Sequence, residues 1–186
     1  RAEAWNRHLG TVWSSLLHDS VPRDGCVVEI GPGFSDKIAY ALAGLRFTGS
    51  LYLVDATSPA LRRSVARYRE LLPQVRIETV CQPIEFAAAR LPAEPSALVM
   101  NHLLDDLLLF AALTRIESRE YFSRMRTNRI DRARCSSSWN AVLSDDRALE
   151  SSKRRTVTAV RTVVDRVRPR LFALANTTVG RFDVAG

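Results

Sequence analysis

The sequence predicts an α/β fold in which a mostly parallel sheet is covered by helices on both faces. Short apolar runs rich in β-branched residues alternate along the chain with stretches of helical periodicity, which is typical of parallel sheets. Right-handed crossovers between such strands place the connecting helices on both faces. The length of 186 residues and the 46% hydrophobic content suit a domain with a substantial core.

Residues 1–25 are expected to contribute a helix, over residues 2–18, that packs on the core or caps the site. Residues 26–186 form the main domain. Apolar residues recur in the first helix at helical spacing. They are Trp5, Leu9, Val12, Trp13 and Leu16.

The first two strands are expected at residues 26–30 and 50–55, which are short, apolar and rich in β-branched residues. Gly31-Pro32-Gly33 breaks the first strand. Ser35 is the expected N-cap of a helix that runs to about residue 45.

Three further elements follow before the middle of the chain. A helix over residues 58–72 is expected to begin with Ser58 as its N-cap and a proline in its first turn. Residues 75–80 alternate like a third strand, and a short helix is expected at 84–90. The apolar run at 97–101 predicts a fourth strand.

A helical insertion is expected at about residues 103–168, which is longer than one crossover requires. It contains a helical pattern to about residue 126 and a second one over 147–167. A fifth strand follows at 170–175. Because few residues come after it, any further strands of the sheet are expected to be short or missing.

The charge and the cysteines exclude several classes of protein. The chain has a net charge of +7, nearly all of its basic residues are arginines, and this excess is spread over several helices. Nucleic acid is therefore a less favoured partner than a small molecule. No apolar run is long enough to span a bilayer, and Cys26, Cys81 and Cys135 match no metal-ligand or disulfide spacing. We expect a cytoplasmic protein with no metal.

The informative motif lies at the end of the first strand, where Glu29 precedes Gly31 and Gly33. Glycines at this position let the backbone turn sharply and let a ligand approach its amides. Asp55 stands at the end of the second strand, where an acidic residue can accept hydrogen bonds from both hydroxyls of a ribose. Together they indicate an adenosine-containing ligand.

The spacing argues against a dinucleotide. Asp36 stands where the dinucleotide motif requires its third glycine, and a carboxylate there would repel a diphosphate. A negative charge on Glu29 suits a ligand that carries an ammonium and a sulfonium. This interpretation makes the glycine loop a site for a positively charged nucleoside.

The order and spacing of these residues resemble the class I, Rossmann-like S-adenosylmethionine-dependent methyltransferases, over about residues 26–110. The resemblance implies that the loop amides meet the methionyl end of S-adenosylmethionine, that Glu29 helps to hold its amino group and that Asp55 holds its ribose. It also places Ala56 beside the adenine. The full set of cofactor-binding residues that it implies is Glu29, Gly31, Pro32, Gly33, Phe34, Asp55, Ala56, Gln82, Pro83, Asn101 and His102.

Methyl transfer from a sulfonium is a direct displacement, so a general base is needed only when the acceptor must lose a proton. His102 is the candidate base, and Asp105 or Asp106 is the candidate orienting group or substrate anchor. The alternative roles are a cofactor contact for His102 and a favourable helix start for the two aspartates.

The expected function is methyl transfer to a small-molecule or natural-product acceptor. The alternatives are an RNA or protein methyltransferase, another S-adenosylmethionine-dependent alkyl transfer, and a non-catalytic subunit of the same fold. The family normally has seven strands, so an uncovered fifth strand at the edge would invite pairing with a second copy. We therefore expect a homodimer through that edge.

Overall fold

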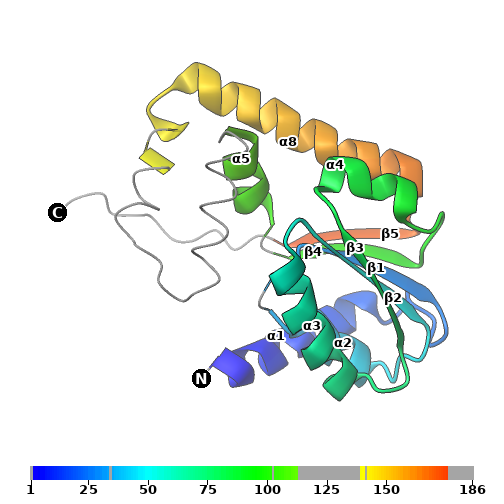
Figure 1. The fold of residues 1–186 in the computed structure, drawn as a ribbon. Helices are drawn as coiled ribbons and strands as arrows, with labels where there is room; N and C mark the ends of the chain where they lie inside the picture. The colour runs from blue at the N-terminus through cyan, green and yellow to red at the C-terminus, as the bar shows by residue number, and fades with distance from the viewer. Residues whose placement is uncertain (1, 34, 102, 113–138, 141, 176–186) are drawn as a thin grey trace.

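The computed structural model describes residues 2–33, 35–101, 103–112, 139–140 and 142–175. Its centre is a five-stranded sheet, parallel throughout, with the order β3-β2-β1-β4-β5 (Figure 1). This order is that of a Rossmann-like sheet and confirms the predicted fold class. The strands are β1 (Cys26–Ile30), β2 (Ser50–Asp55), β3 (Arg76–Cys81), β4 (Ala97–Asn101) and β5 (Leu171–Ala175).

Helices cover both faces of the sheet, as the crossovers require. One face packs against α1 (Ala2–Leu17), α2 (Lys37–Gly44) and α3 (Ser58–Leu71). The other packs against α4 (Ile84–Ala87), the 3₁₀ turn η1 (Ala88–Arg90) and α8 (Asp146–Val167). The helix α5 (Leu104–Ala112) follows β4 and packs against α8.

Two apolar cores result, because successive strand residues point to opposite faces. Val27 and Leu53 lie in the core beneath α1, α2 and α3. Val28 and Met100 lie in the core beneath α4 and α8. β1 and β4 are therefore buried on both faces, which explains why they read as continuous apolar runs rather than alternating ones.

Two predicted helix starts are wrong by one or more residues. Ser35 does not cap α2: its amide closes a turn onto the Pro32 carbonyl at 3.0 Å, and Asp36 is the N-cap. The N-cap of α3 is Thr57 rather than Ser58, because the Thr57 amide and hydroxyl both donate to Asp55 and keep that residue extended. In both cases a contact within the loop moves the cap.

The first helix forms as predicted, but its apolar residues do not share one environment. Trp13 and Leu17 are buried against the core. Trp5, Val12 and Leu16 are exposed by 56%, 57% and 53%. Trp5 is therefore not a core residue, because the helix turns its other side to α2 and the sheet.

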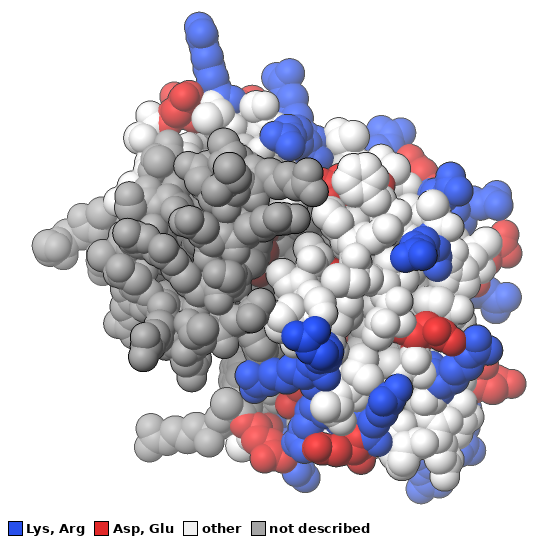
Figure 2. Space-filling view, in the orientation of Figure 1, with Lys and Arg blue, Asp and Glu red and all other residues white. Residues whose placement is uncertain are grey.

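The surface is mixed in charge. On the face seen in Figure 2, Lys and Arg side chains are separated by acidic and uncharged residues rather than gathered into one patch. No helix in the described ranges is long and apolar enough to cross a membrane.

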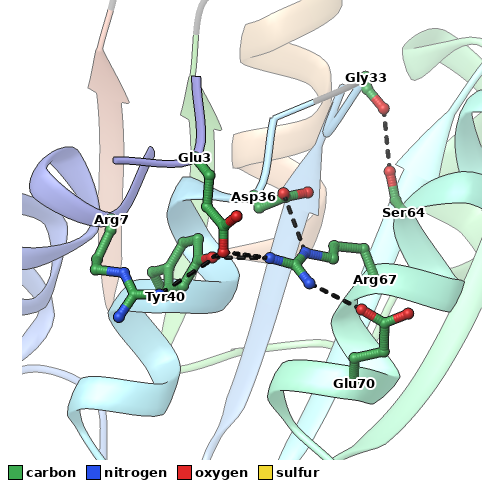
Figure 3. A network of polar contacts seen from close by, with 8 residues as sticks. All are labelled: Glu3, Arg7, Gly33, Asp36, Tyr40, Ser64, Arg67 and Glu70. Carbon is green, nitrogen blue, oxygen red and sulfur yellow. Dashed lines mark hydrogen bonds and ion pairs between the residues drawn. The ribbon is translucent and has the colours of Figure 1, made fainter. Parts of the chain in front are cut away.

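A polar network centred on Arg67 joins the three helices of the first face (Figure 3). From α3, its guanidinium donates to Glu3 of α1 at 3.0 Å and to the Tyr40 hydroxyl of α2 at 2.8 Å. It also contacts Asp36, the N-cap of α2, at 3.4 Å and Glu70 at 2.8 Å. The network therefore holds α1 and the start of α2 in place relative to α3.

We expect Arg67→Met to lower the urea midpoint of unfolding, because it leaves the acceptors on all three helices without their shared donor. The matched control is Arg69→Met, an exposed arginine on the same helix. Equal urea midpoints for the two variants would show that the network does not contribute to stability.

Candidate functional site

A cavity of about 510 Å³ lies at the carboxyl ends of β1, β2 and β4. The strand order reverses between β1 and β4, and ligands of open α/β sheets bind in the crevice at that point. The volume lies within the range of small-molecule and cofactor sites. The cavity is therefore the candidate functional site.

The floor of the cavity is the turn after β1. Gly31 and Gly33 both have positive φ, 67° and 54°, which glycine adopts without the steric cost of a side chain. A Cβ on Gly31 would lie 2.4 Å from a methyl carbon of Leu103, so a side chain there would have to displace the end of Leu103. The Gly31 amide donates to the Val54 carbonyl at 2.7 Å, and the Ser64 hydroxyl donates to the Gly33 carbonyl at 3.1 Å (Figure 3).

Asp55 borders the same cavity from the tip of β2. Its Oδ1 accepts hydrogen bonds from the amide and the hydroxyl of Thr57, both at 2.8 Å. Burial raises the pKa of the Asp55 carboxyl, while the bonds from Thr57 and from the Gly33 amide oppose that rise. The carboxylate thus ties the two loops together and still borders the cavity.

Glu29 lies beneath the cavity and is not part of its wall. Its side chain is 2% exposed, and its Oε2 accepts a hydrogen bond from the Tyr68 hydroxyl at 2.6 Å. Burial raises the pKa of Glu29 to about 8, so the group is mostly protonated at neutral pH. In this structure the Glu29 carboxyl contacts Tyr68 and lies outside the residues that line the cavity, so its contact with a cofactor stays a prediction.

The carboxylate of Asp36 is also turned away. It faces Arg67 rather than the cavity, so it is not positioned to repel a phosphate there. The next residue, Lys37, does line the cavity, and it is 6% exposed. It supplies the cavity's basic side chain within the described ranges, and sequence reasoning missed it. The sequence feature that could have identified Lys37 is its residue type, because nearly all other basic residues of the chain are arginines.

Of the two adjacent aspartates on α5, the structure selects the second. Asp106 lines the cavity, whereas Asp105 is exposed and lies outside its lining. Burial raises the pKa of Asp106 to about 6, with smaller contributions from Asp105 and Asp55. Neighbouring helix positions point about 100° apart, which explains why one carboxyl faces inward and the other faces solvent.

The structure brings together most of the residues implied by the family resemblance. Glu29 and Asp105 lie outside the cavity lining, and Phe34 and His102 lie outside the described residues. Those that line the cavity are Gly31, Pro32, Gly33, Asp55, Ala56, Gln82, Pro83 and Asn101.

The opposite wall of the cavity is apolar. Leu103 and two residues of α5, Leu107 and Phe110, lie on one side, and Ile84 at the start of α4 also lines it. Within the described part of the chain no three His, Cys, Asp or Glu side chains gather as a metal site. A polar floor with apolar walls can take an aromatic base and hold its sugar at the acidic edge.

Comparisons with known proteins add little. No family model matches the chain, and no curated protein matches it. Nineteen chains of solved structures do. One of them is YjhP from E. coli, with 14% identity over 48% of this chain and 35% of that chain, and a TM-score of 0.34. The chain thus spans about a third of YjhP, and a likeness of this size says nothing of function.

We expect the free energy of unfolding of Glu29→Gln to rise relative to that of the wild type as pH increases from about 4.5 to 8. In that window the unfolded carboxyl ionises, while the folded one stays protonated, so wild-type stability falls as pH rises. The difference in free energy of unfolding should change by roughly 3–5 kcal/mol.

Urea unfolding at several pH values measures this effect, and Glu94→Gln is a control at an exposed carboxylate. Parallel pH profiles for Glu29→Gln and the wild type would contradict the assignment of a neutral, buried Glu29.

Proposed function

We propose that this chain is an S-adenosylmethionine-dependent methyltransferase that transfers a methyl group to a small-molecule acceptor by direct displacement. The observation that carries the proposal is that Asp55 and the turn through Gly31 and Gly33 border one cavity where the strand order reverses. An acidic residue at the second strand and a glycine turn at the first are the two elements of an adenosine site.

The charges of the cavity wall fit this cofactor. Asp55 and Asp106 are carboxyl groups with little exposure to solvent, and Lys37 is a buried ammonium. S-Adenosylmethionine carries a sulfonium, an ammonium and a carboxylate, so each charge of the ligand has an opposite charge available. A diphosphate would bring two or more negative charges against the three carboxyl groups of the described lining, Asp55, Glu85 and Asp106, and only one ammonium.

Different residues would contact different parts of the cofactor. Asp55 would accept the ribose hydroxyls, and Ala56, Gln82 and Pro83 would border the adenine. The turn after β1 would face the methionyl end. The cofactor, when bound, supplies a methyl group on a positively charged sulfur. The chain's own task is to align an acceptor with that group and to exclude water, which the apolar side chains of α5 support.

Asp106 is the carboxyl group best placed to act on an acceptor. It faces the cavity beside Leu107 and Phe110, with no hydrogen bond or ion pair to a described residue. A carboxylate in such surroundings can take a proton from an acceptor or anchor a cationic one. We therefore assign to Asp106 the role that sequence reasoning shared between Asp105 and Asp106.

A small acceptor is preferred to RNA or a protein. Among the described residues on the face in Figure 2, Lys and Arg side chains do not form a continuous patch, whereas phosphate contacts need clustered positive charge. Binding of RNA that weakens steeply with salt would favour the alternative.

We expect Asp55→Ala to weaken binding of S-adenosylhomocysteine by roughly 1–3 kcal/mol, because charged hydrogen bonds to the ribose are lost. Isothermal titration calorimetry measures the effect. Thr57→Val is the matched control, since it removes one partner of Asp55 while keeping the carboxylate. Unchanged affinity in Asp55→Ala would contradict the ribose assignment.

We expect one aspartate carboxyl to titrate near pH 6, and NMR of protein labelled with ¹³C in its aspartate side chains can follow it. That titration should vanish in Asp106→Asn and persist in Asp105→Asn. If Asp106 accepts the proton of the acceptor, kcat/KM of the wild type falls as pH falls below about 6. Loss of the pH 6 titration in Asp105→Asn instead would overturn the assignment.

A further inference from the structure

Asp106 is a carboxyl group of the cavity wall that has no cation beside it among the residues that the structure describes. It lines the cavity from α5 and is only partly exposed. The charged groups that act on it, Asp105 and Asp55, are both acidic. The basic side chain of the described lining, Lys37, interacts with Glu29 instead. A carboxylate that is partly removed from water among other acids is costly, so this position favours a ligand group with a positive charge.

The sulfonium of the cofactor is one such group, but pairing it with Asp106 would not help the reaction. The acidic lining as a whole attracts the cofactor, whereas the sulfur gives up its charge as the methyl group leaves. A carboxylate that held this charge would stabilise the bound cofactor more than the transition state. A neutral nitrogen acceptor gains positive charge in the same step, and a carboxylate beside it stabilises the transition state. Catalysis therefore favours contact between Asp106 and the acceptor.

The place of Asp106 in the fold suits contact with an acceptor. The sheet order puts β1 between β2 and β4, so α5, which follows β4, is separated from the tip of β2 by the turn after β1. Asp55, the residue assigned to the nucleoside, ends β2. Three apolar residues of the chain segment around Asp106 also line the cavity: Leu103, Leu107 and Phe110. This wall can pack against an apolar body while the carboxylate contacts its polar end.

Oxygen acceptors fit this wall less well. A carboxylate or a phenolate attacks as an anion, and Asp106, with a pKa of about 6, is mostly ionised at neutral pH and repels it. A neutral alcohol must lose its proton as it attacks, and a carboxylate of that pKa is a weak base for a hydroxyl group. A neutral amine attacks through its lone pair without losing a proton first.

We propose that the acceptor is an amine with an apolar body, whose nitrogen is methylated beside Asp106. The proposal rests on the proposed function and names its substrate class. The nitrogen lone pair forms a bond to the methyl carbon while the bond from that carbon to sulfur breaks, and the electrons of the broken bond stay on sulfur. The nitrogen becomes a charged ammonium next to the Asp106 carboxylate and leaves as such, so no other reactant is needed. An amine that arrives protonated first releases that proton to solvent.

The binding test uses three probes that share a phenyl ring and differ in their polar end: 2-phenylethylamine, 2-phenylethanol and phenylacetate. Each is titrated at neutral pH into protein saturated with S-adenosylhomocysteine, and its Kd is measured by ligand-observed NMR. We expect the amine to bind about tenfold more tightly than the alcohol or the acid, because it alone can pair with Asp106.

Three variants tie this preference to one carboxyl group. Asp106→Asn keeps the size of the side chain and should weaken amine binding about tenfold while leaving alcohol binding unchanged. Asp106→Glu restores the charge and should keep the preference for the amine. Asp105→Asn is the matched control on the same helix, exposed and outside the cavity lining, and should behave as the wild type. All three should bind S-adenosylhomocysteine as the wild type does.

Turnover gives a second readout. With S-adenosylmethionine and a panel of amines, alcohols and acids of matched skeletons, mass spectrometry should find the added methyl group on nitrogen. Methylation of alcohols or acids but of no amine would overturn the substrate class. So would a preference for the amine that survives in Asp106→Asn, or an Asp106→Asn variant that binds S-adenosylhomocysteine more weakly than the wild type.

The two proposals fail in different ways. Protein that binds S-adenosylhomocysteine but none of the amines overturns the substrate class and leaves the proposed function intact. Protein that binds neither S-adenosylhomocysteine nor S-adenosylmethionine overturns the proposed function itself.

Discussion

The left-handed backbone of Gly31 and Gly33 in the turn after β1 is the constraint on which the site depends. Gly31 also packs closely against Leu103, because a methyl carbon of Leu103 lies where a Cβ on Gly31 would be. Two hydrogen bonds hold the same turn. The Gly31 amide donates to the Val54 carbonyl, and the Ser64 hydroxyl donates to the Gly33 carbonyl. The turn after β1 therefore contacts residues that follow or end β4 and β2 and the middle of α3, and the cavity lies beside it.

Packing decides which acidic side chains near this turn face the cavity, and the residue types alone do not indicate it. Four acidic residues lie close to it, yet only two face the cavity. Glu29 is neutralised by burial, and Asp36 is paired with Arg67 at the junction of three helices. Among the described residues, the cavity lining holds the carboxyl groups of Asp55, Glu85 and Asp106 and one ammonium, that of Lys37. The mixed charge of the cavity lining follows from this division rather than from the overall charge of the chain.

Sequence reasoning located the five strands to within a residue and the main helices nearly as well, because apolar periodicity is a local property. It also placed the glycine turn and Asp55 at the carboxyl edge of the sheet, because each directly follows or ends a recognisable strand, and both line the cavity. It placed the caps at Ser35 and Ser58 because it could not see the contacts that Pro32 and Asp55 make within the loops.

The sequence by itself determined the order of the elements, the sheet they form and the edge of the sheet at which the cavity lies. Only the tertiary structure decided which ionisable groups face the cavity. Direction on a helix separates Asp105 from Asp106, and contact with Tyr68 and Arg67 withdraws Glu29 and Asp36. These outcomes depend on side chains far apart in the chain, whose desolvation and pairing arise only when the helices pack.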